Sequence, residues 1–137
     1  MFCADATLDA VLRRVFGLVV VAPLTDPSLQ ELSANYDRVS HTCRLYVDDG
    51  GGPMRPLEAA LLPAAIIAGT RILATLDGQS LSPTAAFLNC VLANGFRYHA
   101  ALPPVTDGPS FAIRAHARLM RLLAELICRR GSKAPCI

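Results

Sequence analysis

The 137-residue sequence lacks the short motifs that most often carry catalysis. It contains no G-x-x-x-x-G-K-[S/T] phosphate loop. The glycine run at 50–52 lacks the following lysine and hydroxyl residue that hold phosphates and magnesium. A G-x-S-x-G nucleophile motif is also missing. We therefore expect that this chain is not an enzyme by itself, and we predict no catalytic residue.

Metal-binding spacings are missing as well. No two of the five cysteines are spaced C-x-x-C, and the three histidines show no H-x-x-x-H spacing. We therefore predict no metal site, and no cofactor for the chain on its own. An odd number of cysteines without a disulfide framework favours reduced thiols.

The chain also has no long uninterrupted apolar run. Its most apolar stretch, residues 57–74, is broken by Glu58, Pro63, Gly69 and Arg71. A membrane-spanning helix needs about 20 predominantly apolar residues. The first residues lack the basic region of a signal peptide. These features predict a cytoplasmic protein.

Net charge is small, at +2, and so gives no argument for a nucleic-acid partner. The basic residues nevertheless gather toward the carboxyl end, at Arg114, Arg118, Arg121, Arg129, Arg130 and Lys133. A solvated helix face explains such a cluster. The alternative is a small basic protein that binds nucleic acid through this segment, with an affinity that falls steeply with salt.

Three segments have helical character. In residues 6–21, apolar side chains recur every three or four positions, and Pro23 is expected to end this helix. Residues 56–76 form the longest helical candidate, with Pro63 as its expected start, because proline is favoured in a first turn. A final helix is predicted over residues 115–130.

Strand patterns lie between these helices. Residues 35–37 carry turn chemistry, and residues 43–47 alternate as a strand does. An apolar run at 85–92 is followed by Asn94-Gly95, which favours a tight hairpin turn, and by an alternating return strand. The predicted strands after that turn are residues 96–102 and 110–114.

The order of these elements predicts an α+β fold, with one antiparallel sheet and helices packed on it. The apolar content of 53% is sufficient for a core. We expect a single domain over residues 1–130 and an unstructured tail over residues 131–137.

Two stretches resemble a known family. Residues 94–105 (NGFRYHAALPPV) and 108–114 (GPSFAIR) are similar to the G-x-R-F-x-G-x-L-P-P-V and A-P-x-F-x-I-R motifs of TrbB-type conjugal-transfer ATPases. These ATPases belong to the secretion traffic ATPase superfamily. Residues 26–35 and 44–47 resemble its D-P-x-V-x-E-I-x-x-N and R-L-W-V segments, in the same order. Leu122 falls where the family has its T-L-x-D-Y element.

The resemblance implies a PAS-like α+β domain from the amino-terminal half of such an ATPase, ending before the RecA-like domain that carries the phosphate loop. In that family the amino-terminal domains form one ring of a hexamer, and nucleotide lies between the two domains of a subunit. The matching motif arginines are Arg97 and Arg114, which the resemblance assigns to contact with the nucleotide phosphates. The alternative is that both are solvent-facing strand residues paired with carboxylates.

The expected function is therefore oligomerisation and nucleotide sensing in a type IV secretion or conjugal-transfer ATPase, with ATP and Mg²⁺ belonging to the full-length family. Expected partners are further copies, full-length traffic ATPase subunits and other secretion components. Nucleic acid is not expected, and membrane contact is expected to be at most peripheral, at a bacterial inner membrane. A remnant of a disrupted gene, with no function of its own, is a further alternative.

Overall fold

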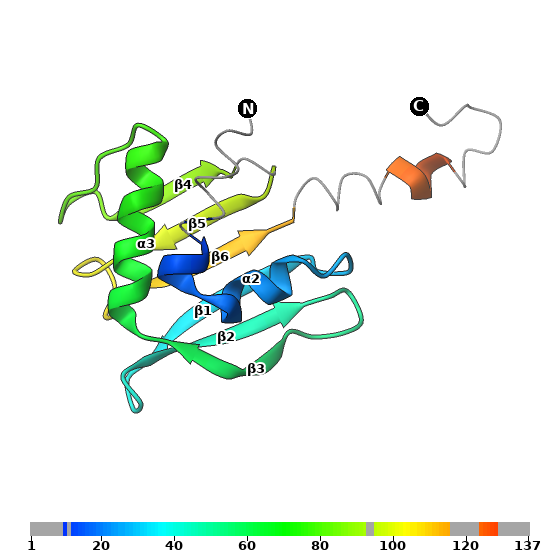
Figure 1. The fold of residues 1–137 in the computed structure, drawn as a ribbon, viewed down its shortest axis with the longest axis horizontal. Coiled ribbons are helices and arrows are strands. Elements are labelled where there is room, and N and C mark those ends of the chain that lie inside the picture. The colour runs from blue at the N-terminus through cyan, green and yellow to red at the C-terminus, as the bar shows by residue number, and fades with distance from the viewer. Residues whose placement is uncertain (1–9, 11, 93–94, 116–123, 129–137) are drawn as a thin grey trace.

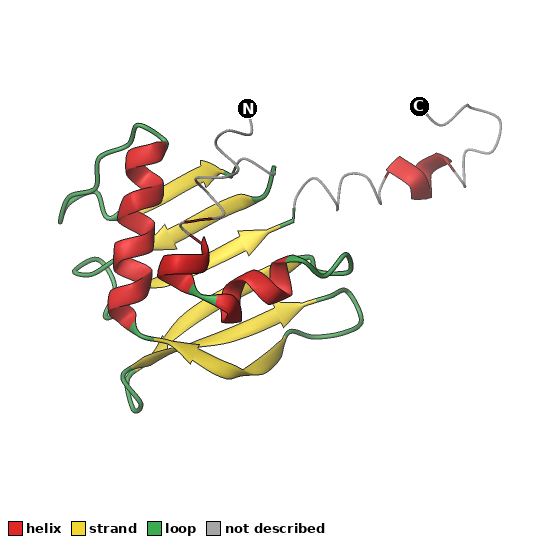
Figure 2. Ribbon diagram, viewed as in Figure 1, coloured by secondary structure: helices red, strands yellow, loops and turns green. Residues whose placement is uncertain are grey.

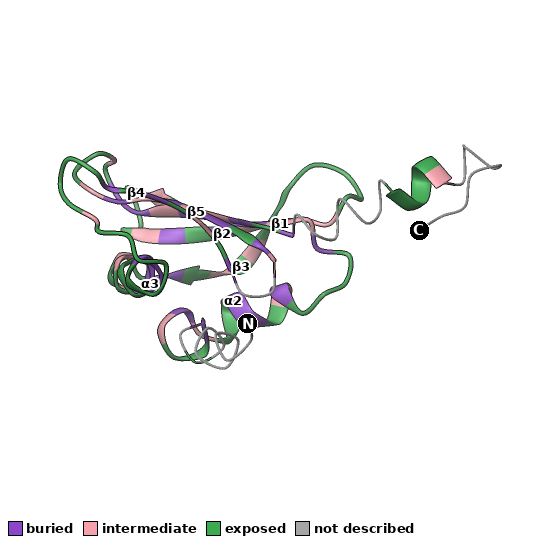
Figure 3. Cartoon of the chain, turned by 90° about the horizontal axis from the view of Figure 1, so that it is seen from above, coloured by how far each residue is buried: buried purple, intermediate pink, exposed green. Residues whose placement is uncertain are grey.

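The computed structural model of the chain describes residues 10, 12–92, 95–115 and 124–128. These residues form a six-stranded sheet in the order β3-β2-β1-β6-β5-β4, in which every neighbouring pair is antiparallel. The helices next to the sheet lie on one of its faces (Figures 1, 2 and 3). The predicted α+β class, an antiparallel sheet with packed helices, is confirmed.

The strands follow the sequence pattern closely in the second half of the chain. Both the hairpin after residue 85 and the strand at 110–114 are confirmed, as is the strand at 43–47. The strand bounds are β1 (Glu31–Asp37), β2 (Thr42–Asp48), β3 (Arg55–Leu61), β4 (Phe87–Val91), β5 (Arg97–Ala101) and β6 (Ser110–Arg114).

Two predictions in the first half are wrong. Residues 35–37 are not a turn but the end of β1, where they pair with residues 42–44 of β2. Residues 55–61 form strand β3 rather than the beginning of a helix. In both cases pairing with β2 supplies the backbone hydrogen bonds, and this long-range contribution overrides local preference.

The helices are η1 (Leu12–Phe16, a π-helix), α2 (Leu18–Leu24) and α3 (Pro63–Leu76). The single helix predicted over 6–21 is interrupted at Gly17, whose φ of 83° is outside the helical region. Its second part continues past Pro23 to Leu24. By contrast, α3 begins at Pro63 as predicted.

The structure describes only part of the carboxyl-terminal segment, for which a helix and a tail were predicted. Residues 124–128 are helical, in agreement with the helix predicted over 115–130. Residues 116–123 and 129–130, Leu122 included, lie outside the described residues, as does the tail predicted at 131–137. No helix in the described ranges is long and apolar enough to cross a membrane.

The core lies between the helices and the sheet. Phe16 of η1 packs in a T-shaped contact on Phe111 of β6, with ring centroids 5.5 Å apart, and Phe111 stacks on Tyr98 of β5 at 5.6 Å. On the other side, Phe16 lies directly against the backbone of Gly69 in α3. One aromatic side chain thus joins η1 and α3 to the centre of the sheet.

Cys43 and Cys90 have free thiols, as predicted. Cys128 is disulfide-bonded, so the expectation of reduced thiols is wrong at that residue. Sequence spacing did not indicate the bond, because pairing depends on spatial proximity.

Candidate functional site

The two arginines singled out by the sequence are direct neighbours across two strands. Arg97 of β5 and Arg114 of β6 are Cα partners in the antiparallel register. Because paired residues project to the same face, their side chains share the face opposite the helices. The next residues inward, Tyr98 and Ile113, are fully buried beneath the helices. Both arginines are exposed.

A carboxylate from a third strand joins this pair. Glu31 of β1 is the Cα partner of Arg114 on its other side, and Arg114 Nε donates to Glu31 Oε1 at 2.7 Å. Arg97 has no hydrogen bond or ion pair with any of the described residues. Arg114 is thus paired with a carboxylate, as the alternative expects, whereas no carboxylate among the described residues pairs with Arg97. We call Glu31, Arg114 and Arg97 the charged row.

A shallow hollow of about 490 Å³ lies beside the charged row on the same open face. His99, two residues along β5 from Arg97, lines this hollow. The Nδ1 atom of His99 is hydrogen-bonded to Asn89 Oδ1 of β4. The spacing of the histidines in the sequence bears only on metal binding and gives His99 no other role. The two-residue alternation of the strand already places His99 on the face of Arg97, so this signal was present in the sequence.

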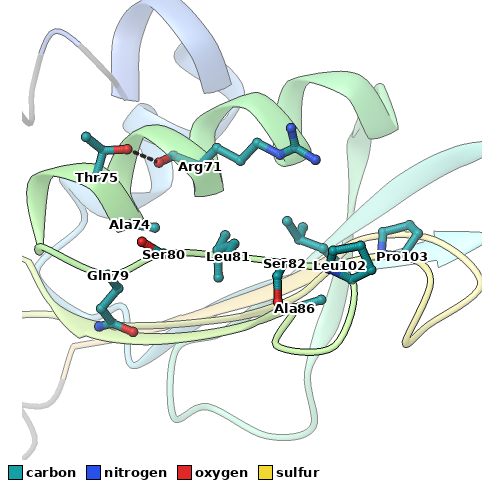
Figure 4. Close-up of a pocket in the computed structure, with 11 residues that line it drawn as sticks. Arg71, Ala74, Thr75, Gln79, Ser80, Leu81, Ser82, Ala86, Leu102 and Pro103 are labelled. Atoms are coloured by element: carbon teal, nitrogen blue, oxygen red, sulfur yellow. Dashed lines mark hydrogen bonds between the residues drawn. The ribbon is translucent and has the colours of Figure 1, made fainter.

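A second hollow, of about 370 Å³, lies between the end of α3, the loop after it and the end of β5 (Figure 4). Arg71 is its only charged lining residue, and hydroxyl groups from Thr75, Ser80 and Ser82 accompany it. It contains neither predicted arginine. The described residues that line it include no carboxylate and no histidine, and so they offer no acid–base pair.

The two free cysteines of the described residues, Cys43 and Cys90, are not activated as nucleophiles. Burial raises the pKa of the Cys43 thiol to about 11. Burial, with a smaller contribution from Asp77, also raises the pKa of Cys90 to about 11. Both thiols are therefore almost wholly protonated near neutral pH, whereas a nucleophilic cysteine needs a lowered pKa.

The chemistry available at the charged row is anion binding. Two guanidinium groups from adjacent strands can each offer paired N–H donors to a phosphate or carboxylate. Within the part of the chain that the structure describes, no group of three or more His, Cys, Asp or Glu side chains could hold a metal ion. Most of the basic cluster behind the nucleic-acid alternative lies outside the described residues.

Comparison with protein-family models gives no match, and neither does comparison with curated proteins. Among solved structures, the fold is similar to that of the VirB11 ATPase from the Brucella suis type IV secretion system, crystallised with sulphate. The TM-score is 0.62 at 18% sequence identity, over 81% of this chain and 31% of the VirB11 chain. This chain therefore spans about a third of the length of that ATPase. At this identity the likeness shows a common fold.

Proposed function

We propose that this chain acts as the amino-terminal, nucleotide-sensing and oligomer-forming domain of a type IV secretion ATPase of the TrbB kind. In this role Arg97 and Arg114 contact the phosphates of a nucleotide held against the open face of the sheet. The observation that carries the proposal is the cross-strand pairing of these two arginines in a fold that also occurs in a type IV secretion ATPase.

The arrangement of the charged row favours an anion as its ligand. Like charges directly opposite one another in a sheet are destabilising. Glu31 offsets the charge of Arg114, while the guanidinium of Arg97 makes no polar contact with the described residues. A phosphate between the two arginines would offset the second charge and accept hydrogen bonds from both.

Hydrolysis is assigned to a different domain. The sequence has no phosphate loop, which is the element that holds the phosphates and magnesium for hydrolysis. ATP and Mg²⁺ would therefore be held mainly by a RecA-like domain. Arg97 and Arg114 would bind the phosphates and move with them. The proposed partners are further copies, full-length traffic ATPase subunits and other secretion components, in the cytoplasm.

Titration with Mg²⁺-ATP, followed by NMR of the isotope-labelled protein, tests the arginine assignment. We expect shifts centred on β5 and β6. Arg97→Ala and Arg114→Ala should each weaken binding by roughly tenfold, since a hydrogen bond to a charged group contributes about 1.5–3 kcal/mol. The matched control is Arg44→Ala, an exposed arginine of β2 away from the pair. Equal binding by all three variants would contradict the assignment.

Mixing experiments test the assembly part of the proposal. The purified chain would be combined with a full-length type IV secretion ATPase and examined by size-exclusion chromatography with light scattering. Mixed oligomers and a changed ATPase rate are expected. A chain that joins neither the full-length ATPase nor its isolated RecA-like domain would rule out this role.

A further inference from the structure

The two edges of the sheet differ in how they are protected. Edge strands offer unpaired backbone groups to other chains, and proteins usually block them with proline, charge or a bulge. Strand β3 has all three devices: Pro56, Glu58 and an irregular register against β2 between Arg44 and Tyr46. Strand β4, at the opposite edge, has the sequence FLNCV and none of these devices.

The register of the β4–β5 hairpin shows which backbone groups of β4 face outward. Leu92 N donates to Phe96 O at 2.7 Å, and Leu102 N donates to Ala86 O at 2.9 Å. Because hydrogen-bonded pairs alternate in an antiparallel ladder, the even-numbered residues of β4 bond to β5. The backbone N–H and C=O groups of Phe87, Asn89 and Val91 therefore face away from the sheet.

These outward groups are almost all unsatisfied by the described part of the chain. Only the carbonyl of Asn89 has a partner there, the side-chain amide of Gln79 at 2.9 Å. The side chains of Phe87 and Val91 are 59% and 56% exposed, so the edge is apolar as well as open. Such an edge is suited to accept an additional strand.

We propose that β4 pairs with β4 of a second copy of this chain, antiparallel and about a two-fold axis through Asn89, to give a continuous twelve-stranded sheet. The three outward-facing residues are symmetrical about Asn89. In this register Phe87 lies opposite Val91 of the second copy, and Asn89 lies opposite Asn89. Every outward N–H and C=O then has a partner, and each exposed apolar side chain meets an apolar one.

Pairing of β4 with β4 of a second copy is more favourable than head-to-tail pairing of β4 with β3 of a second copy. Pro56 has no N–H to donate, and pairing would bury the exposed carboxylate of Glu58. Helix α3 ends beyond β4 (Figure 1), where Leu76 is 55% exposed. A copy joined at β4 would bring the two α3 ends near each other and cover this apolar side chain.

The pairing is expected to be weak and concentration-dependent. A five-residue strand offers an interface at the low end of the size range of stable complexes. The amide of Gln79 must also leave the carbonyl of Asn89 before a strand can bind there. Gln79→Ala should therefore strengthen the association rather than weaken it.

Sedimentation velocity over a concentration series tests the dimer. The wild-type chain should shift toward dimer as concentration rises, whereas Phe87→Lys, which adds a charge to the edge, should stay monomeric. Leu62→Lys is the matched control, since Leu62 is similarly exposed and lies outside β4, and it should behave as wild type. Monomers at every concentration, or equal behaviour of the two lysine variants, would overturn the proposal.

Disulfide trapping tests the register. Opposed residues in a hydrogen-bonded antiparallel pair have Cα atoms about 5.5 Å apart, within disulfide reach. Asn89→Cys should therefore cross-link to itself above the wild-type level. Phe87→Cys and Val91→Cys should cross-link when mixed but not separately, since Phe87 of one copy lies roughly 14 Å from Phe87 of the other. Self-linking of Phe87→Cys as strong as that of the mixture would exclude the register.

This inference is independent of the nucleotide contacts in the proposed function. It rests on the backbone of β4 and not on Arg97 or Arg114, so loss of ATP binding in the arginine variants would leave the dimer unchanged. Failure of the β4 dimer would likewise leave the nucleotide assignment standing.

Discussion

The hydroxyl of Thr70 in α3 lies 2.7 Å from the phenolic oxygen of Tyr98 in β5. Both side chains are fully buried, and this bond crosses the interface between the helical layer and the sheet. Burial is the main reason that the pKa of Tyr98 lies well above its usual value. The bond fixes α3 directly beneath the strand that carries Arg97 and His99.

Removing both partners of this hydrogen bond is expected to lower the free energy of unfolding by less than the sum of the two single removals. Tyr98→Phe leaves the Thr70 hydroxyl buried without a partner, as Thr70→Val does for the phenol, and each should lower the free energy of unfolding by about 1–3 kcal/mol. The double variant should lose clearly less than the sum of the two, because no polar group is then left unsatisfied. Urea denaturation of the four proteins measures this coupling, and strict additivity would contradict it.

A methyl group at Gly69 should destabilise the protein although it improves helix propensity. A Cβ atom there would lie 2.4 Å from Phe16 Cζ, which is closer than real contacts allow. Overpacking of this kind costs about 1–3 kcal/mol, against a gain of up to about 1 kcal/mol from replacing glycine by alanine in a helix. Thermal or urea unfolding of Gly69→Ala measures the net loss.

Shortening the opposing side chain provides the control for this prediction. Phe16→Leu should cost less in the Gly69→Ala background than in the wild-type background, because it removes the clash. A Gly69→Ala variant as stable as wild type would show that Phe16 can move aside.

Stability should decrease in alkaline solution through Cys43. Burial raises the pKa of this thiol from its ordinary value of 9.0 to about 11 in the folded protein. A group with a raised pKa contributes its full stability below the unfolded pKa and loses it as the pH rises through the folded pKa. The free energy of unfolding should therefore fall between about pH 9 and pH 11.

The matched variant for this prediction is Cys43→Ala. It should be less stable at every pH, because it removes a buried side chain, but its stability should fall less steeply over the alkaline range. Denaturant titrations at several pH values compare the two slopes. Identical slopes would show that Cys43 does not contribute to the alkaline loss.

Glu31 is expected to compete with phosphate for Arg114. Glu31→Gln removes the charge that now holds the Arg114 guanidinium and leaves two uncompensated arginines in the charged row. Binding of inorganic pyrophosphate, measured by calorimetry, should become several-fold tighter in this variant. The control is Asp49→Asn, which removes a carboxylate that pairs instead with Arg55. Equal affinities for wild type and Glu31→Gln would contradict a shared anion site.

How far the sequence predicted each element depended on how local its determinants are. The strand at 110–114 and the start of α3 at Pro63 were found because alternation and proline chemistry act within a few residues. β1 was missed, because its last residues, 35–37, combine polar character with turn propensity. β3 was missed because its alanine and leucine content is equally compatible with a helix.

The residues of the candidate site also differ in whether local sequence patterns could indicate them. Motif similarity and alternation indicated Arg97 and Arg114 and could have indicated His99. Neither could indicate Glu31, which lies 83 residues before Arg114. Its place in the charged row depends on β1 pairing with β6 in the middle of the sheet.

The sequence by itself determined the α+β class, the β4–β5 hairpin, the limits of α3 and the identity of two candidate arginines. Each of these follows from periodicity, turn residues or a motif within a short stretch of chain. Only the tertiary structure decided the strand order, which residue neutralises Arg114, and which edge of the sheet is open. Those properties depend on hydrogen bonds between distant strands, and the pairing of distant strands is not encoded in any local pattern.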